Sequence, residues 1–230
     1  MLSIRRRSHQ KYVVVGLALL LAGLSFAKEP RRGVEGEAPR ALLAEGATQA
    51  PIKEPAIKTK TVDNFERYKV GQFPTWFKTW PFQRSDTQKV YSVRQEEGNK
   101  FLRADDAKDL SKQIFKEFSW DLKQYPYFKW RWRAKVLPKN AAENVGAKND
   151  SACGIYIVFG RMSGRALKYN WSTTLPVGTT FEKKPGKMHM TMVDSGSQHL
   201  GKWRSHSIHI PTEYKNLFKA GMEKGPSGFA

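Results

Sequence analysis

The chain has 230 residues, of which 40 are Lys or Arg and 21 are Asp or Glu, so its formal net charge is +19. Its single cysteine, Cys153, excludes an intramolecular disulfide. A charge this positive favours polyanionic partners such as anionic glycans, lipid phosphates or acidic proteins.

Residues 1–27 have the pattern of a secretory signal. Basic residues precede an apolar run over 13–27, and small residues stand at Ser25 and Ala27. This pattern predicts cleavage before Lys28 and export to the periplasm or the cell exterior, where nucleic acid is not an expected partner. Because the run is shorter than the roughly 20 residues that cross a bilayer, we expect no transmembrane domain after cleavage. An uncleaved anchor stays open as the alternative.

The rest of the chain divides by composition. Residues 28–60 contain several prolines and no aromatic residue, which predicts a disordered linker. All the tryptophans lie between Trp76 and Trp203, so residues 61–230 are predicted to form one domain with a single core.

The chain stops on the apolar pair Phe229-Ala230, in a segment that looks like the start of a strand. We therefore expect a domain truncated at its C-terminal end, with one sheet edge unpaired.

The domain reads as short strands between turn residues, which is typical of an all-β fold. The Gly98-Asn99 pair separates two strands closely and predicts a hairpin. The fold we expect is an antiparallel two-sheet β-sandwich or jelly roll with one short C-terminal helix over 212–219. The expected strands are 90–93, 101–104, 112–120, 128–136, 154–159, 166–171, 187–193 and 203–210.

One of these strands alternates apolar and cationic residues. Side chains on a strand point to opposite faces with a period of two. The apolar face is therefore expected in the core, and it consists of Phe128, Trp130, Trp132, Ala134 and Val136. The other face is a row of positive charge, which we call the basic row: Lys129, Arg131, Arg133 and Lys135.

The basic row has two interpretations. Neighbouring members of the row would stand about 6–7 Å apart, a spacing that suits an extended anionic polymer gripped by bidentate arginines. Alternatively, acidic residues of adjacent strands neutralise the row, because like charges on one face repel. The candidates for that pairing are Asp105, Asp106, Glu117 and Asp150.

Segments spread over residues 90–230 also carry a family resemblance. The most specific is Pro126 followed by Trp130-Arg131-Trp132-Arg133, and further matching segments lie at 101–104, 155–159, 167–172 and 200–203. Together they resemble the uncharacterised bacterial family called domain of unknown function 3047, although 205–209 departs from its pattern. The resemblance implies an exported β-sandwich similar to jelly-roll carbohydrate-binding modules, with no activity attached to it.

Aromatic residues offer a second kind of ligand contact, because flat rings stack on sugar rings. We single out Trp76, Tyr169 and Trp171 as candidate stacking surfaces. Core packing is the alternative for every tryptophan, and it is the preferred interpretation for Trp130 and Trp132.

The sequence predicts no cofactor, no metal site and no catalytic group. Met188, Met190 and Met192 flank His189 and suggest copper, but on a strand the methionines share one face and His189 faces away. A methionine-lined core patch is the better account. Cys153 precedes an apolar run and is expected to be a buried, inert thiol.

These features predict a non-catalytic, exported protein that binds an anionic or neutral glycan of the cell envelope, or another envelope polyanion. Two alternatives stay open. One is a glycan-cleaving lyase or hydrolase in which Asp150, Tyr169 and His206 converge in the same groove. The other is a structural envelope protein whose basic face docks an acidic partner; an open groove would favour binding and a flat face docking. The expected ligand-binding residues are Lys129, Arg131, Arg133, Trp171, Tyr169, Trp76 and Asp150.

Overall fold

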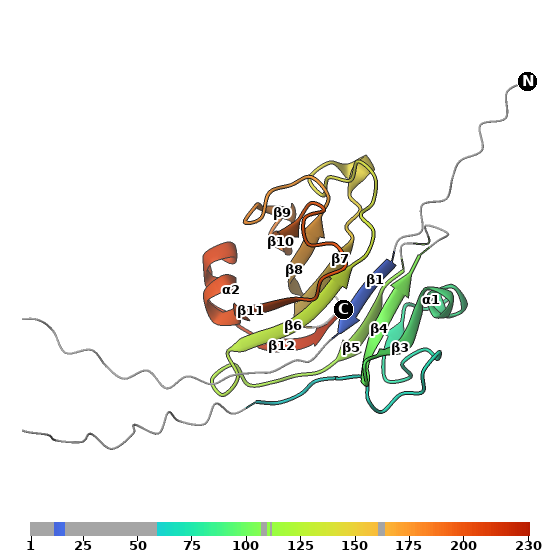
Figure 1. Cartoon of the computed structure of the whole chain (residues 1–230). Helices are drawn as coiled ribbons and strands as arrows, with labels where there is room; N and C mark the ends of the chain where they lie inside the picture. The colour runs from blue at the N-terminus through green and yellow to red at the C-terminus, as the bar shows by residue number, and fades with distance from the viewer. Residues whose placement is uncertain (1–11, 17–58, 107–109, 111, 161–163) are drawn as a thin grey trace, which may run out of the picture.

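The computed structural model describes residues 12–16, 59–106, 110, 112–160 and 164–230. The described part of the chain is mostly β (Figure 1). Most of the predicted linker and most of the predicted signal lie outside the described residues. The elements are β1 (Tyr12–Gly16), β2 (Lys78–Thr79), α1 (Arg84–Val90), β3 (Tyr91–Glu96), β4 (Asn99–Asp105), β5 (Ile114–Glu117), β6 (Tyr127–Ala134), the 3-10 helix η1 (Gly146–Lys148), β7 (Cys153–Phe159), β8 (Arg165–Ser172), β9 (Thr180–Lys184), β10 (Met188–Ser195), β11 (Arg204–His209), α2 (Ile210–Phe218) and β12 (Pro226–Phe229).

The strands form two sheets. One has five strands in the order β11-β6-β1-β4-β3, and the other has seven in the order β2-β5-β12-β7-β8-β10-β9. In Figure 1, β6, β1, β4 and β3 run side by side as the first of these sheets. Within the described ranges, neither helix has the length and apolar character needed to span a bilayer.

Aromatic side chains from both sheets share one core. The rings of Trp130 (β6) and Tyr169 (β8) lie 5.4 Å apart between centroids, and those of Phe128 (β6) and Phe229 (β12) lie 6.3 Å apart. Trp130, Tyr169 and Phe128 are each at most 1% exposed. Removing such large apolar surfaces from water is the main stabilising contribution to the fold.

Several predictions of local structure are confirmed. The hairpin at Gly98 joins β3 to β4, and its turn residues Glu97 and Gly98 both have positive φ, as a two-residue turn of type I′ requires. The C-terminal segment is a strand, but β12 pairs with both β5 and β7, so it is an interior strand of its sheet. The short elements α1, β2, η1 and β9 were not predicted, and neither was strand β1 within the predicted signal.

The expectation of purely antiparallel sheets is wrong at one place. Strands β8 and β10 are parallel, whereas β9 and β10 are antiparallel. After β8, residues 173–179 skip the neighbouring place in the sheet and lead to β9, which forms the sheet edge. Strand β10 then returns into the gap, which makes it parallel to β8. The alternation of apolar and polar residues indicates a strand but not its direction in the sheet. The sequence therefore does not predict that β8 and β10 are parallel.

Candidate anion-binding face

Strand β6 separates apolar from cationic side chains as its alternation predicts. Its apolar members Phe128, Trp130, Trp132 and Ala134 are at most 1% exposed and belong to the core. The basic row therefore lies on the opposite side of the five-stranded sheet, which we call the outer face.

The structure divides the basic row into a paired end and an open end. At the paired end, Arg133 Nη2 lies 2.5 Å from Glu96 Oε2, and Lys135 Nζ lies 3.9 Å from Glu96 Oε1. Glu96 was not among the expected partners. It reaches this end of the row because the β3–β4 hairpin places it on the outer face. Two of the expected partners bind other cations: Asp105 pairs with Arg103, and Glu117 pairs with Lys78.

At the open end, Arg131 is exposed and Lys129 is half-buried. Among the residues that the structure describes, no carboxylate oxygen is found within 4.0 Å of either cation. Strand β11 pairs with this part of β6 and places Ser205 beside Arg131 and Ser207 beside Lys129. Both serines are exposed, so two hydroxyls accompany two cations along the sheet edge.

Trp203 holds the two arginines of the row. The guanidinium carbons of Arg131 and Arg133 lie 5.0 and 4.9 Å from the centre of its ring. Cation–π attraction at such distances fixes flexible guanidinium groups in place. Trp203 also contacts Phe101 edge-on, at 5.7 Å between centroids. Its role here was missed because only the pairing of β11 with β6 brings it to the row.

Two of the predicted stacking residues are in the core, which corrects the expectation that they offer stacking surfaces. Tyr169 and Trp171 are both 0% exposed. The indole Nε1 of Trp171 donates to the carbonyl of Gly196 at 3.1 Å. Tyr169 packs on Trp130, and burial raises the pKa of its hydroxyl well above the usual value. The period-two face of β8 that holds these two residues is its apolar core face.

Trp76 is 59% exposed, as its loop position suggested. The guanidinium carbon of Arg67 lies 3.8 Å from the centre of its ring, so one cation already stacks on it. Trp76 precedes β2 at the edge of the seven-stranded sheet, whereas the basic row belongs to the five-stranded sheet. It therefore does not share a face with Arg131.

Asp150 lines a cavity of about 400 Å³ together with Cys153, Lys168 and Trp132. Neither Tyr169 nor His206 lines this cavity, so the structure does not bring the three candidate catalytic residues around one space. Cys153 is buried, as predicted, and burial followed by the negative charge of Asp194 raises the pKa of its thiol well above the usual value.

A buried carboxylate, which the sequence did not predict, connects the two sheets. Asp194 on β10 is 2% exposed. It accepts hydrogen bonds from Trp132 Nε1 at 2.6 Å and Arg204 Nε at 3.0 Å, and it lies 2.7 Å from His206 Nε2. Burial alone would raise the pKa of Asp194, but the contacts with His206, Trp132 and Arg204 outweigh it and lower that pKa below the usual range. The β-bulge between Met192 and Asp194 turns the carboxylate toward the facing sheet.

The methionine segment is a buried patch, as predicted. Met190 and Met192 are at most 2% exposed. His189 lies 4.7 Å from the ring of Phe218 and 3.7 Å from a Glu182 oxygen. In the described ranges, no group of three or more His, Cys, Asp or Glu side chains is arranged to hold a metal ion.

Comparison with known proteins identifies the family. The model of a family described as proteins of unknown function, DUF3047, matches residues 74–226, which include the basic row, Trp203 and most of both sheets. The chain belongs to the DUF3047 family. No curated protein and no solved structure matches the chain significantly. The resemblance seen in the Trp-Arg-Trp-Arg segment is therefore confirmed, and the family assigns no activity.

Proposed function

We propose that this DUF3047 protein is a non-catalytic binding protein of the cell envelope that holds an extended anionic ligand, such as a carboxylated or phosphorylated glycan, on the outer face. The observation that carries the proposal is the open end of the basic row. Lys129 and Arg131 lie on the outer face without a carboxylate partner among the described residues, beside two exposed hydroxyls.

Several other cations of the domain are ion-paired, in contrast to the open end of the row. Arg133, Arg103, Lys78 and Lys116 each have a carboxylate within 4.0 Å. An unpaired guanidinium held by Trp203 has already lost part of its conformational freedom, so less entropy is lost when an anion binds.

The fold supports the same proposal. Two sheets that share an aromatic core are compatible with a β-sandwich of the jelly-roll type, similar to carbohydrate-binding modules. The export pattern at the N-terminus would bring this face into contact with envelope glycans in the periplasm or at the cell exterior. Extended polymers suit a row of cations along a strand, where one charge recurs about every 6–7 Å.

A second candidate is the docking of an acidic protein on the same cations. Lys129 and Arg131 line neither the cavity beside Asp150 nor the two hollows that Tyr214 lines. On the outer face an acidic polypeptide would meet the same cations without entering a groove.

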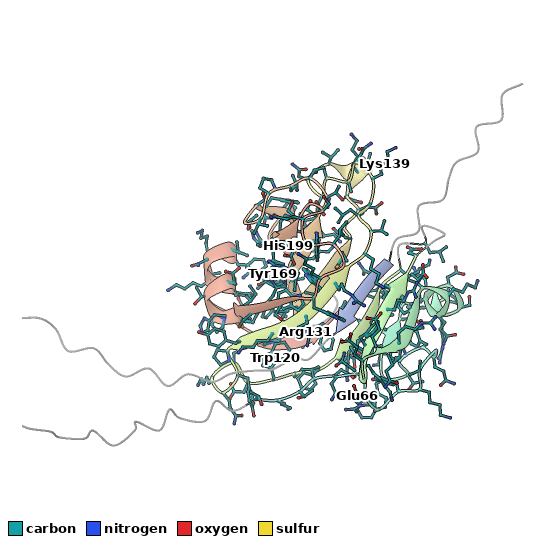
Figure 2. The ribbon with its side chains drawn as sticks, viewed as in Figure 1. Glu66, Trp120, Arg131, Lys139, Tyr169 and His199 are labelled. Atoms are coloured by element: carbon teal, nitrogen blue, oxygen red, sulfur yellow. The ribbon has the colours of Figure 1, made fainter. Side chains whose placement is uncertain are left out.

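The test is binding of the full chain to an array of neutral and anionic glycans and to poly-glutamate, at about 50 mM and about 200 mM NaCl. The variant Lys129→Gln/Arg131→Gln removes the open end. The variant Lys139→Gln/Lys148→Gln removes the same charge from exposed residues elsewhere; Lys139 is well separated from Arg131 in Figure 2.

We expect selective binding of one anionic glycan class, weakened about tenfold in the first variant and less than about twofold in the control. Preferential binding of poly-glutamate with the same loss would favour the docking candidate. An equal loss in both variants would mean diffuse charge attraction, and it would overturn the assignment to this face. Absence of binding to every probe would overturn both candidates.

A further inference from the structure

Strand β1 comes from the predicted export signal, yet it is an interior strand of the folded domain. It pairs antiparallel with β4 through Tyr12–Asp105 to Val15–Leu102, and antiparallel with β6 through Val13–Ala134 to Gly16–Arg131. Figure 1 shows it between the two neighbours. Cleavage before Lys28 would therefore remove the central strand of the five-stranded sheet.

Without β1, the sheet would have a gap that its own strands cannot close. Both neighbours are antiparallel to β1, so β4 and β6 are parallel to each other and two strand spacings apart, about 10 Å. Their facing N–H and C=O groups would lack partners along residues that are otherwise buried, such as Leu102 and Trp132. Unpaired backbone groups at buried positions are costly, and an open strand edge pairs readily with an extended peptide.

We propose that the gap between β4 and β6 is a strand-accepting site and that residues 12–16 of the N-terminal segment are its occupant in the unprocessed chain. Removal of this segment on export opens the site to another extended peptide by strand addition. The segment is joined to the rest of the described domain only through residues 17–58, so it binds as a tethered ligand and not as an integral part of a hairpin.

The pairing register of β1 indicates which peptide sequences the site can bind. Position 13 pairs with Ala104 and Ala134, and position 15 pairs with Leu102 and Trp132. These four partner residues are buried. Positions 13 and 15 require apolar residues. Position 14 lies between Arg103 and Arg133 on the outer face. The site therefore selects an extended strand with apolar residues at alternate positions and accepts a polar or acidic residue between them.

This register supplies a matched pair of variants. Val15→Asp places a carboxylate at the level of Leu102 and Trp132, whereas Val14→Asp places the same side chain between two arginines. Both changes make the N-terminal segment less apolar by the same amount, so effects on its membrane affinity are equal. The two variants should therefore differ in hydrogen exchange only if the segment is inserted into the sheet.

The experiment is hydrogen exchange on the purified full chain and on each variant, with a synthetic peptide of residues 11–17 added to Val15→Asp. We expect amides of β4 and β6 that face the gap to exchange about 100-fold faster in Val15→Asp and within about threefold of the parent in Val14→Asp. Added peptide should restore protection.

Amides of β7 and β8 serve as an internal reference, because these strands belong to the other sheet. If Val15→Asp unfolds the whole domain, recovery of protection on adding the peptide supports the proposal. Failure of the peptide to restore any protection would overturn it. Equal exchange in the two variants would also overturn it, since the segment would then lie outside the sheet.

Discussion

The indole Nε1 of Trp132 donates a 2.6 Å hydrogen bond to Asp194 Oδ2, and this contact joins the strand that carries the basic row to the facing sheet. The same carboxylate contacts Arg204 and His206 on β11. Asp194 thereby positions β11, which directly follows Trp203 and carries the two serines at the open end of the row.

Replacing Asp194 should destabilise the domain. In Asp194→Ala, the side chains of His206 and Arg204 and the indole N–H lose their shared acceptor in the core, and we expect a loss of about 3 kcal/mol in the free energy of unfolding. Urea unfolding measures it. Glu117→Ala, which removes an exposed pair with Lys78, should cost less than about 1 kcal/mol. Equal losses in the two variants would contradict the role assigned to Asp194.

Asp194 should also make stability depend on pH. Because its pKa is lower in the folded protein than its usual value of 3.8, its contribution is complete above pH 3.8 and disappears as the pH falls through the lowered folded value. The free energy of unfolding should therefore fall more steeply below about pH 4 in the parent than in Asp194→Asn. Parallel pH profiles for the two proteins would be inconsistent with the lowered pKa.

Freeing the paired end of the basic row should strengthen anion binding. Glu96→Gln removes the partner of both Arg133 and Lys135. Since partly exposed ion pairs of this kind are worth about 0.2–1 kcal/mol, we expect the selected anionic glycan to bind about 1.4- to fivefold more tightly. Titration at low salt measures the change. Glu66→Gln, which removes a carboxylate outside the row, is the control, and an equal gain there would indicate a general charge effect.

Gly228 should not tolerate a side chain. A Cβ at this position would lie 2.7 Å from the carbonyl oxygen of Lys116 on the paired strand β5. The contact is with backbone, so the sheet itself must shift, and Gly228→Ala should cost about 2 kcal/mol in thermal or urea unfolding. Gly221→Ala is the matched control, because nothing lies within 4 Å of its added Cβ. A Gly228→Ala variant as stable as the control would show that β12 is placed differently.

The sequence predicted those parts of the fold that depend on side-chain period alone. The alternation in β6 predicted its buried and basic faces, and the Gly98 turn predicted the β3–β4 hairpin. The same reasoning misplaced the ligand contacts at Tyr169 and Trp171. A tryptophan on a strand can face either way, and only the position of the second sheet shows that these two are in the core.

By itself, then, the sequence determined the all-β composition, the family and the two faces of β6, because local propensity and period-two alternation act within a single strand. The tertiary structure decided the rest: which cations Glu96 neutralises, that Trp203 holds Arg131, that Asp194 joins the sheets, and that residues 12–16 fill the gap beside β6. Each of these contacts joins residues from different strands, and strand order is set by how two sheets bury their apolar faces together, which no short stretch of sequence specifies.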